Sequence, residues 1–201
     1  MSKRHLVVGV VWIAAATLVL AQEAKPQTQA GAPAVPAAAA AEKKGPPKPV
    51  AELKRLAQLK GKWTAQETYF PNEMTPEGGK GEGTLTAVMA LDARFLYDSY
   101  KSMTPLGALD GVGLLTYDME AKVYRGWWFD SMGSAEEMSG NWEGETLVLT
   151  GESTFMGKKY SNRMTYHDIT PDSYVFTIES SVDGGPLQKT METVYTRVKT
   201  N

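Results

Sequence analysis

The chain has 201 residues, with 21 Lys and Arg against 23 Asp and Glu, no Cys and a formal net charge of −2. The absence of Cys excludes thiol catalysis, disulfide bonds and thiolate metal sites. A chain without a basic surplus is a poor candidate for a nucleic-acid partner, because nucleic acids are bound by a basic face.

Residues 1–21 have the pattern of a secretory signal peptide. Lys3 and Arg4 form a basic start, and an apolar run follows that is short for a transmembrane helix. Small residues precede the boundary, so we expect cleavage after Ala21; an uncleaved anchor is the alternative. The protein is thus predicted to be exported, periplasmic or secreted, without stable membrane insertion after cleavage.

Residues 22–49 are rich in Ala, Pro, Gln and Lys. This composition cannot bury apolar area, so it predicts a disordered linker, either a passive spacer or a tether from a membrane or wall. The folded domain is expected to span residues 50–201. It begins with apolar residues at helical spacing from Val50 to Lys60, which predict a short helix that covers one end of the fold.

From Gly61 onward the pattern is one of strands and turns. No intervening stretch is long enough for a crossover helix, which excludes a parallel sheet. We therefore predict an all-β fold, an antiparallel up-and-down barrel of about ten strands, with a sandwich as the less favoured arrangement. The expected strands are residues 61–70, 81–91, 94–103, 111–117, 123–130, 137–142, 145–155, 158–167, 173–181 and 187–199.

The hairpin over residues 111–133 is rich in aromatic residues and apolar on both faces. Such a hairpin is expected in the middle of a sheet. Trp127 and Phe129 share one face of its second strand, and they are candidate ligand-binding residues.

Connections after the odd-numbered strands are predicted to be longer or richer in Gly than the others, and function often resides on such loops. Four methionines fall in or beside them: Met74, Met103, Met132 and Met156. Their flexible thioethers predict an adaptable apolar rim at the mouth of the barrel. Two alternatives are methionines that only fill gaps under loops and a Cu(I) site.

An ordered set of short motifs spans nearly all of residues 50–199. It comprises Leu59 to Trp63, Tyr117-Asp118, Lys122 to Tyr124, Trp127, Asp130 to Met132, Gly140, Leu147 to Gly151, Arg163 and Met191 to Arg197. This set resembles a bacterial lipocalin-like (calycin-type) family catalogued as a domain of unknown function, number fifteen seventy-nine. The resemblance implies a lipocalin-like barrel and no established activity. Where the family tends to have Gly-Gly before an Arg, this chain has Asp92-Ala93-Arg94.

Calycin barrels are similar to one another in a Gly-x-Trp near the start whose indole packs beneath a late Arg. Gly61-Lys-Trp63 and Arg197 match this pattern. We therefore expect the Arg197 guanidinium over the Trp63 indole, with Leu53 and Leu56 covering the same end.

Several charged residues are candidates for chemistry inside the barrel. Glu67 shares a face with Tyr69 and is expected to point inward, where Arg163 and Glu192 would complete a set that orients a polar ligand group. The alternative is a structural ion pair. A glycosidase pair of carboxylates including Asp130 has no motif to support it. His167, the only His outside the predicted signal peptide, lacks a second ligand for haem or metal.

The sequence favours an exported lipocalin-like protein that binds a small, largely apolar ligand, with no cofactor and no resident metal. The alternatives are a hydrolase or isomerase that uses interior carboxylates, and an accessory domain that binds another envelope component. The predicted ligand-binding residues are Glu67, Tyr69, Trp127, Phe129, Arg163, Glu192, Met74, Met103, Met132 and Met156.

Overall fold

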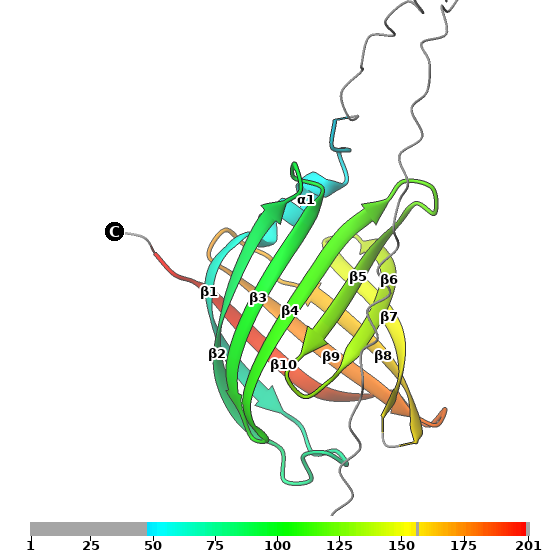
Figure 1. Cartoon of the computed structure of the whole chain (residues 1–201). Helices are drawn as coiled ribbons and strands as arrows, with labels where there is room; N and C mark the ends of the chain where they lie inside the picture. The colour runs from blue at the N-terminus through cyan, green and yellow to red at the C-terminus, as the bar shows by residue number, and fades with distance from the viewer. Residues whose placement is uncertain (1–47, 156, 200–201) are drawn as a thin grey trace, which may run out of the picture. The chain divides into compact units, whose positions relative to one another are not determined.

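The computed structural model describes residues 48–155 and 157–199 (Figure 1). The predicted signal peptide, most of the predicted linker and Met156 lie outside the described residues. No helix within the described ranges is both long and apolar enough to cross a membrane.

Ten strands of the described chain close into an antiparallel up-and-down barrel, as predicted (Figure 1). Each strand pairs with its neighbour in sequence, and β1 closes the barrel by pairing with β10. The strands are β1 (Gly61–Tyr69), β2 (Gly79–Ala90), β3 (Phe95–Thr104), β4 (Gly107–Asp118), β5 (Val123–Asp130), β6 (Ala135–Glu143), β7 (Thr146–Phe155), β8 (Lys158–His167), β9 (Ser173–Val182) and β10 (Gln188–Arg197).

The predicted difference in loop length between the two ends of the barrel is wrong at the β3–β4 hairpin. β4 begins at Gly107, so Pro105 and Leu106 alone join it to β3. Gly107 has a φ of 113°, and the Thr104 hydroxyl donates to its carbonyl at 2.9 Å. Glycine adopts this conformation without strain, so the turn is tight and both strands extend further than the sequence pattern indicated.

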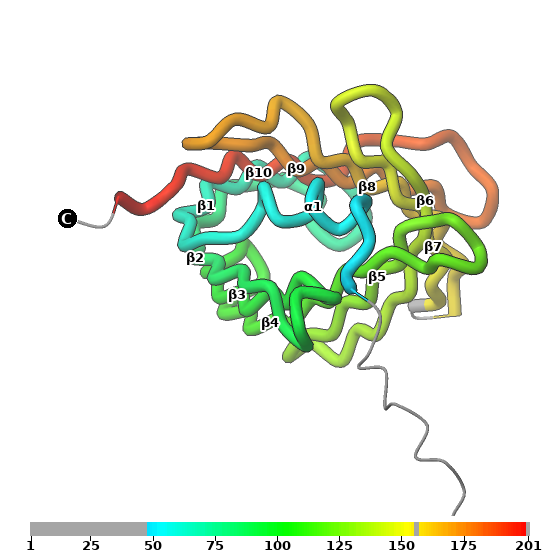
Figure 2. The backbone as a smooth tube through the Cα atoms, turned by 90° about the horizontal axis from the view of Figure 1, so that it is seen from above, coloured from blue at the N-terminus to red at the C-terminus, as the bar shows by residue number. Residues whose placement is uncertain are grey.

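One end of the barrel, the helix end, is covered by a short helix, as expected. α1 (Leu53–Leu56) continues into the 3₁₀ turn η1 (Ala57–Leu59), and Figure 2 looks down on α1 where it crosses this end. Leu53, Leu56 and Leu59 are 5%, 0% and 2% exposed. Their burial anchors the segment, because four helical residues have no stability of their own.

The predicted contact between Trp63 and Arg197 is confirmed at the helix end. The two residues are directly paired across β1 and β10, and the guanidinium carbon lies 3.9 Å from the centre of the indole ring. The indole N–H donates to the Leu59 carbonyl at 2.9 Å, and Arg197 Nη1 donates to the Lys60 carbonyl at 2.8 Å. β1, β10 and the helical segment are thereby joined at one point.

Candidate functional site

The inner surface of the barrel changes character along its length. Side chains alternate between the two faces of a strand, so residues in register with the buried core point inward. At the helix end these are apolar: Trp63, Ala65, Leu85, Leu96, Leu115, Leu147 and Leu149. Further toward the opposite end, the loop end, four carboxyl residues occupy inward positions: Glu67 on β1, Asp98 on β3, Asp130 on β5 and Glu136 on β6.

Glu67 points inward, as expected, and is 2% exposed. Its carboxylate accepts hydrogen bonds from the hydroxyls of Tyr100, Ser102 at 2.8 Å and Tyr69 at 3.1 Å. Burial, together with the adjacent Glu67 charge, raises the pKa of both Tyr69 and Tyr100. Both tyrosines therefore stay protonated and donate to Glu67, which leaves this carboxylate well satisfied.

Asp98 is the inward carboxyl that lacks such partners. Its Oδ1 atom is buried and has no hydrogen-bond partner among the described residues. Burial raises the pKa of Asp98 to about 7. Sequence reasoning missed this residue, although a signal was present: Asp98 lies between Leu96 and Tyr100 on the same face of β3, and both neighbours belong to the core.

An aromatic wall from β8, β9 and β10 faces Asp98 across the barrel. Tyr174 and Tyr195 are stacked with ring centres 4.5 Å apart, and Tyr166 packs on Phe176 at 4.8 Å. Burial raises the pKa of Tyr166, Tyr174 and Tyr195, and the Asp98 charge is a further cause for each of the three. Their hydroxyls make no hydrogen bond to another described residue.

Two further buried side-chain atoms in the described ranges have no hydrogen-bond partner. Thr193 Oγ1 lies on the inner face of β10, two residues from Tyr195, and Thr193 is 0% exposed. Trp142 Nε1 lies at the helix end, where the Arg55 guanidinium covers the indole at 3.9 Å. Thr193 therefore adds an unpaired hydroxyl to the same interior as Asp98.

The remaining inward carboxyls are paired. Trp128 Nε1 donates to Asp130 Oδ2 at 3.0 Å. The Asn162 amide donates to Glu136 Oε1 at 2.7 Å, and Ser180 donates to the Asn162 carbonyl oxygen at 2.8 Å. Burial raises the pKa of Glu136, and the Asn162 hydrogen bond opposes that shift. Asp98 thus differs from its neighbours in its unpaired oxygen.

Several inward residues around Asp98 keep some accessible surface. Asp98, Trp128, Tyr166 and Phe176 all take inward positions, yet each keeps intermediate exposure. Asp98 therefore lies among aromatic residues that are not completely buried.

Trp127 and Phe129 do not share this interior. Phe129 is 47% exposed, and both residues alternate with the inward Trp128 and the buried Tyr124, so they lie on the outer face of β5. Aromatic residues occur on both faces of this strand, and the sequence pattern therefore did not reveal which face was inner. Trp128 is the aromatic residue of β5 that faces Asp98.

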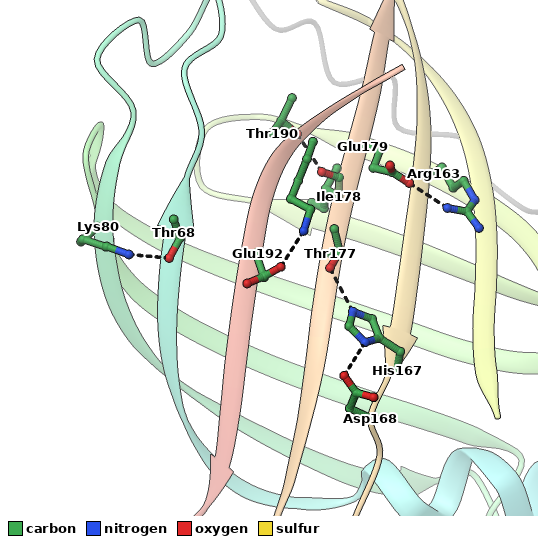
Figure 3. A network of polar contacts seen from close by, with 11 residues as sticks. Thr68, Lys80, Arg163, His167, Asp168, Thr177, Ile178, Glu179, Thr190 and Glu192 are labelled. Carbon is green, nitrogen blue, oxygen red and sulfur yellow. Dashed lines mark hydrogen bonds and ion pairs between the residues drawn. The ribbon is translucent and has the colours of Figure 1, made fainter. Parts of the chain in front are cut away.

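Arg163 and Glu192 lie on the outer face and do not join Glu67. Figure 3 shows Arg163 with Glu179, at 2.7 Å between Nη1 and Oε2. Glu192 instead pairs with Lys189 at 2.7 Å. Arg163 precedes the buried Met164 in β8, and this alternation turns it away from the core.

His167 also lies in the outer network of polar contacts (Figure 3). Its Nδ1 is 2.9 Å from Asp168 Oδ2, and its Nε2 is 3.2 Å from the Thr177 hydroxyl. Within the described ranges, no group of three or more His, Cys, Asp or Glu is arranged to hold a metal ion.

The predicted methionine rim is not formed by the described residues. Met103 is 59% exposed and lies between the buried Ser102 and Thr104, which places its side chain on the outer face of β3. Met74 and Met132 are 50% and 48% exposed in separate loops.

Comparison with known proteins agrees with this architecture. A family model described as "Protein of unknown function (DUF1579)" matches residues 48–197. The chain belongs to this family, and its fold is that of a lipocalin-like barrel. A sequence comparison with curated proteins finds no match.

The solved structures that match this chain have low sequence identity, and the first described here, with a TM-score above 0.5, shares its fold. The crystal structure of Rv2717c from M. tuberculosis is similar with a TM-score of 0.56 and 14% identity, over 76% of this chain and 100% of that one. The S-type phycobiliprotein lyase CPES from Guillardia theta has a TM-score of 0.48 and 12% identity, over 76% of this chain and 100% of that one.

Proposed function

We propose that the protein binds a small, largely apolar molecule inside the barrel, between Asp98 and the aromatic wall. The observation that carries this proposal is the unpaired, buried Oδ1 of Asp98. Leaving a buried polar group without a hydrogen bond costs about 1–3 kcal/mol, and more when the group is charged. A bound molecule that supplies a donor to Asp98 removes this cost.

The surroundings of Asp98 support the same proposal. Thr193 Oγ1 is buried in the same interior without a hydrogen-bond partner, and Tyr166, Tyr174 and Tyr195 take inward positions on β8, β9 and β10. Apolar walls with a few convergent polar groups are the usual composition of a small-molecule site. A barrel of about this size can hold one small ligand.

The proposal is tested by filling the interior with a larger side chain. Ile178 points inward on β9 and packs against the core, whereas Val175 on the same strand points outward. We expect Ile178→Trp to abolish uptake of the neutral apolar dye Nile red, measured by fluorescence, and Val175→Trp to leave it unchanged. Thermal melting of each variant checks that it is folded. Ser180→Phe, also inward, replaces Ile178→Trp if that variant does not fold.

Equal Nile red uptake by the folded inward and outward variants would exclude the barrel interior as the binding site. Native mass spectrometry of the gently purified protein is the complementary measurement, and a retained small molecule would identify the natural ligand. Export remains part of the proposal, supported by the signal-like pattern of residues 1–21. A mature N-terminus at Gln22, found by N-terminal sequencing, is the expected result.

Acid–base catalysis is a second candidate function, favoured by one observation. The pKa of Asp98 is raised to about 7 by burial. A carboxyl that titrates near neutral pH suits a general acid or base. Turnover of a molecule retained by the purified protein, lost in Asp98→Asn, would establish an enzyme; binding without turnover supports the binding function.

A further inference from the structure

The inner face of the barrel is acidic between its two ends. Its four carboxyl residues are Glu67, Asp98, Asp130 and Glu136. The described basic residues in register with the inner face lie at strand ends. Arg94 precedes β3, Arg197 ends β10 above Trp63, and Lys158 begins β8 and pairs with Glu73 at 2.7 Å.

We propose that this interior selects ligands that carry a protonated amine on a flat apolar body, with the amine paired to Asp98. The inference rests on the proposed binding function and names its ligand class. Asp98 is the partner because Glu67, Asp130 and Glu136 already accept hydrogen bonds from tyrosine and serine hydroxyls, an indole and an amide. An anionic ligand would meet four carboxyls, and this repulsion excludes it.

The aromatic residues around Asp98 favour a cation for a second, independent reason. A Cβ added to Gly113 on β4 would lie 3.3 Å from the Asp98 Cβ and 3.5 Å from Trp128 Cε3. Carboxyl and indole therefore flank the same glycine, and no side chain separates them. Indole and phenol rings attract an ammonium group within about 6 Å of their faces. A carboxylate beside aromatic rings is thus a suitable site for an amine.

The wall opposite Asp98 suits the flat body of such a ligand. Tyr174 and Tyr195 stack on each other with ring planes 18° apart and are 2% and 8% exposed, so Tyr166 and Phe176, which keep intermediate exposure, are the rings that a ligand can contact. The Tyr166 hydroxyl can accept a hydrogen bond from a further N–H group. Aromatic amines combine the two features that this interior recognises.

Three naphthalene probes of nearly equal size test the proposal: 2-naphthylmethylamine, 2-naphthylmethanol and 2-naphthoate. Their affinities are measured by isothermal titration calorimetry at pH 8. We expect the amine to bind about tenfold tighter than the alcohol, the difference made by one charged hydrogen bond, and the carboxylate to bind weakest. Because the bodies are matched, differences in affinity report the charged group alone.

Two variants separate pairing by Asp98 from a general effect of negative charge. Asp98→Asn keeps the shape of the side chain and should reduce the amine to the affinity of the alcohol. Glu136→Gln removes another inward carboxyl, one already bonded by Asn162, and should change the ratio of the two affinities less than threefold. Both variants are first checked for a single cooperative melting transition, which shows that they are folded.

Lowering the pH to 5.5 supplies a further readout. The titratable groups that face Asp98 from β8, β9 and β10 are Tyr166, Tyr174 and Tyr195, whose raised pKa values keep them neutral at both pH values. Glu136 on β6 is the other inward carboxyl whose pKa is raised by burial, so the pH series is repeated with Glu136→Gln to isolate the charge of Asp98. Protonation of Asp98 should weaken amine binding by about tenfold or more, without changing the alcohol.

Each outcome has a definite reading. If no probe binds, the proposed binding function itself fails. If the alcohol or the carboxylate binds as tightly as the amine, the protein binds small molecules but the preference for amines is wrong. If the amine is preferred equally by Asp98→Asn, another group recognises it and Asp98 is not the partner.

Discussion

The helix end of the barrel and the interior around Asp98 are built from similar residues but differ in how their polar groups are satisfied. At the helix end, the Trp63 indole donates to Leu59 and Arg197 donates to Lys60. Around Asp98, a carboxyl oxygen and the Thr193 hydroxyl are buried without a partner. Of the unpaired buried atoms in the described ranges, the helix end has Trp142 Nε1, which lies beneath the Arg55 guanidinium, whereas the Asp98 region has a carboxyl oxygen and a hydroxyl and therefore loses more stability to unpaired groups.

A fold retains unpaired buried polar groups, which lower its stability, where function requires them. Polar groups that are already paired within the protein are not free to bind a ligand. The two regions lie within one barrel, so they share the same backbone hydrogen bonding and differ only in their side chains. Substitutions should therefore reduce stability at the helix end and increase it around Asp98.

The largest effect is expected for Trp63→Ala. Trp63 is 1% exposed and contacts Arg197 and the Tyr174 ring at 4.9 Å. Its loss should lower the free energy of unfolding by about 3–5 kcal/mol, measured by urea denaturation. Trp127→Ala, on the outer face, is the matched control and should cost about 1 kcal/mol. Equal losses would show that the helix end has no special role.

The next largest effect is expected for Asp98→Asn, with the opposite sign. The folded pKa of about 7 lies above the ordinary 3.8, so the folded protein binds this proton more tightly than the unfolded chain does. Stability therefore falls as the pH rises from about 4 to 7, and the penalty is complete above 7. Removing the charge should stabilise the protein by about 1–4 kcal/mol at pH 8 and have little effect at pH 4.

The control for Asp98→Asn is Asp110→Asn. Asp110 lies on the outer side of β4 and pairs with Lys101 at 3.2 Å, with 66% of its side chain exposed. Its substitution should leave the free energy of unfolding nearly unchanged between pH 4 and 8. A stabilisation by Asp98→Asn that is the same at both pH values would contradict the role assigned to its charge.

A smaller effect distinguishes two buried threonines. Thr193→Val removes an unpaired interior hydroxyl and should stabilise the protein by about 1 kcal/mol. Thr177, 5% exposed on the outer face, bonds His167 at 3.2 Å, and Thr177→Val should cost about 1 kcal/mol. Thermal denaturation of both variants gives the comparison, and a loss of stability in Thr193→Val would indicate that its hydroxyl is satisfied.

Much of the fold could be predicted from the sequence, because strand alternation and turn residues are local signals. The contact of Trp63 with Arg197 was predicted from the resemblance to calycin barrels, and it agrees with the order of the strands, since the first and last strands of a meander meet when it closes. The β3–β4 turn was misplaced because Gly107 could not be recognised as the turn residue from composition alone.

The candidate site was harder to predict, because it depends on which face of each strand is inner. In β5 both faces are aromatic, and Trp127 was chosen where Trp128 faces the interior. Asp98 and the tyrosines of β8 to β10 are far apart in sequence, and only closure of the barrel brings them together. No local sequence motif indicates that Asp98 and these tyrosines share the barrel interior.

The smallest effect is expected for Arg163→Ala, which compares the outer surface with the interior. Arg163 and Glu179 form a pair at 2.7 Å, with 40% and 28% of their side chains exposed. Partly exposed pairs contribute about 0.2–1 kcal/mol, so Arg163→Ala, Glu179→Ala and the double variant should give a coupling energy in this range by urea denaturation. Nile red uptake should not change in any of them, because both side chains point away from Asp98. If folded Arg163→Ala lost Nile red uptake, the ligand would be recognised on the outer face, and Arg163 would be a ligand-binding residue as the sequence predicted.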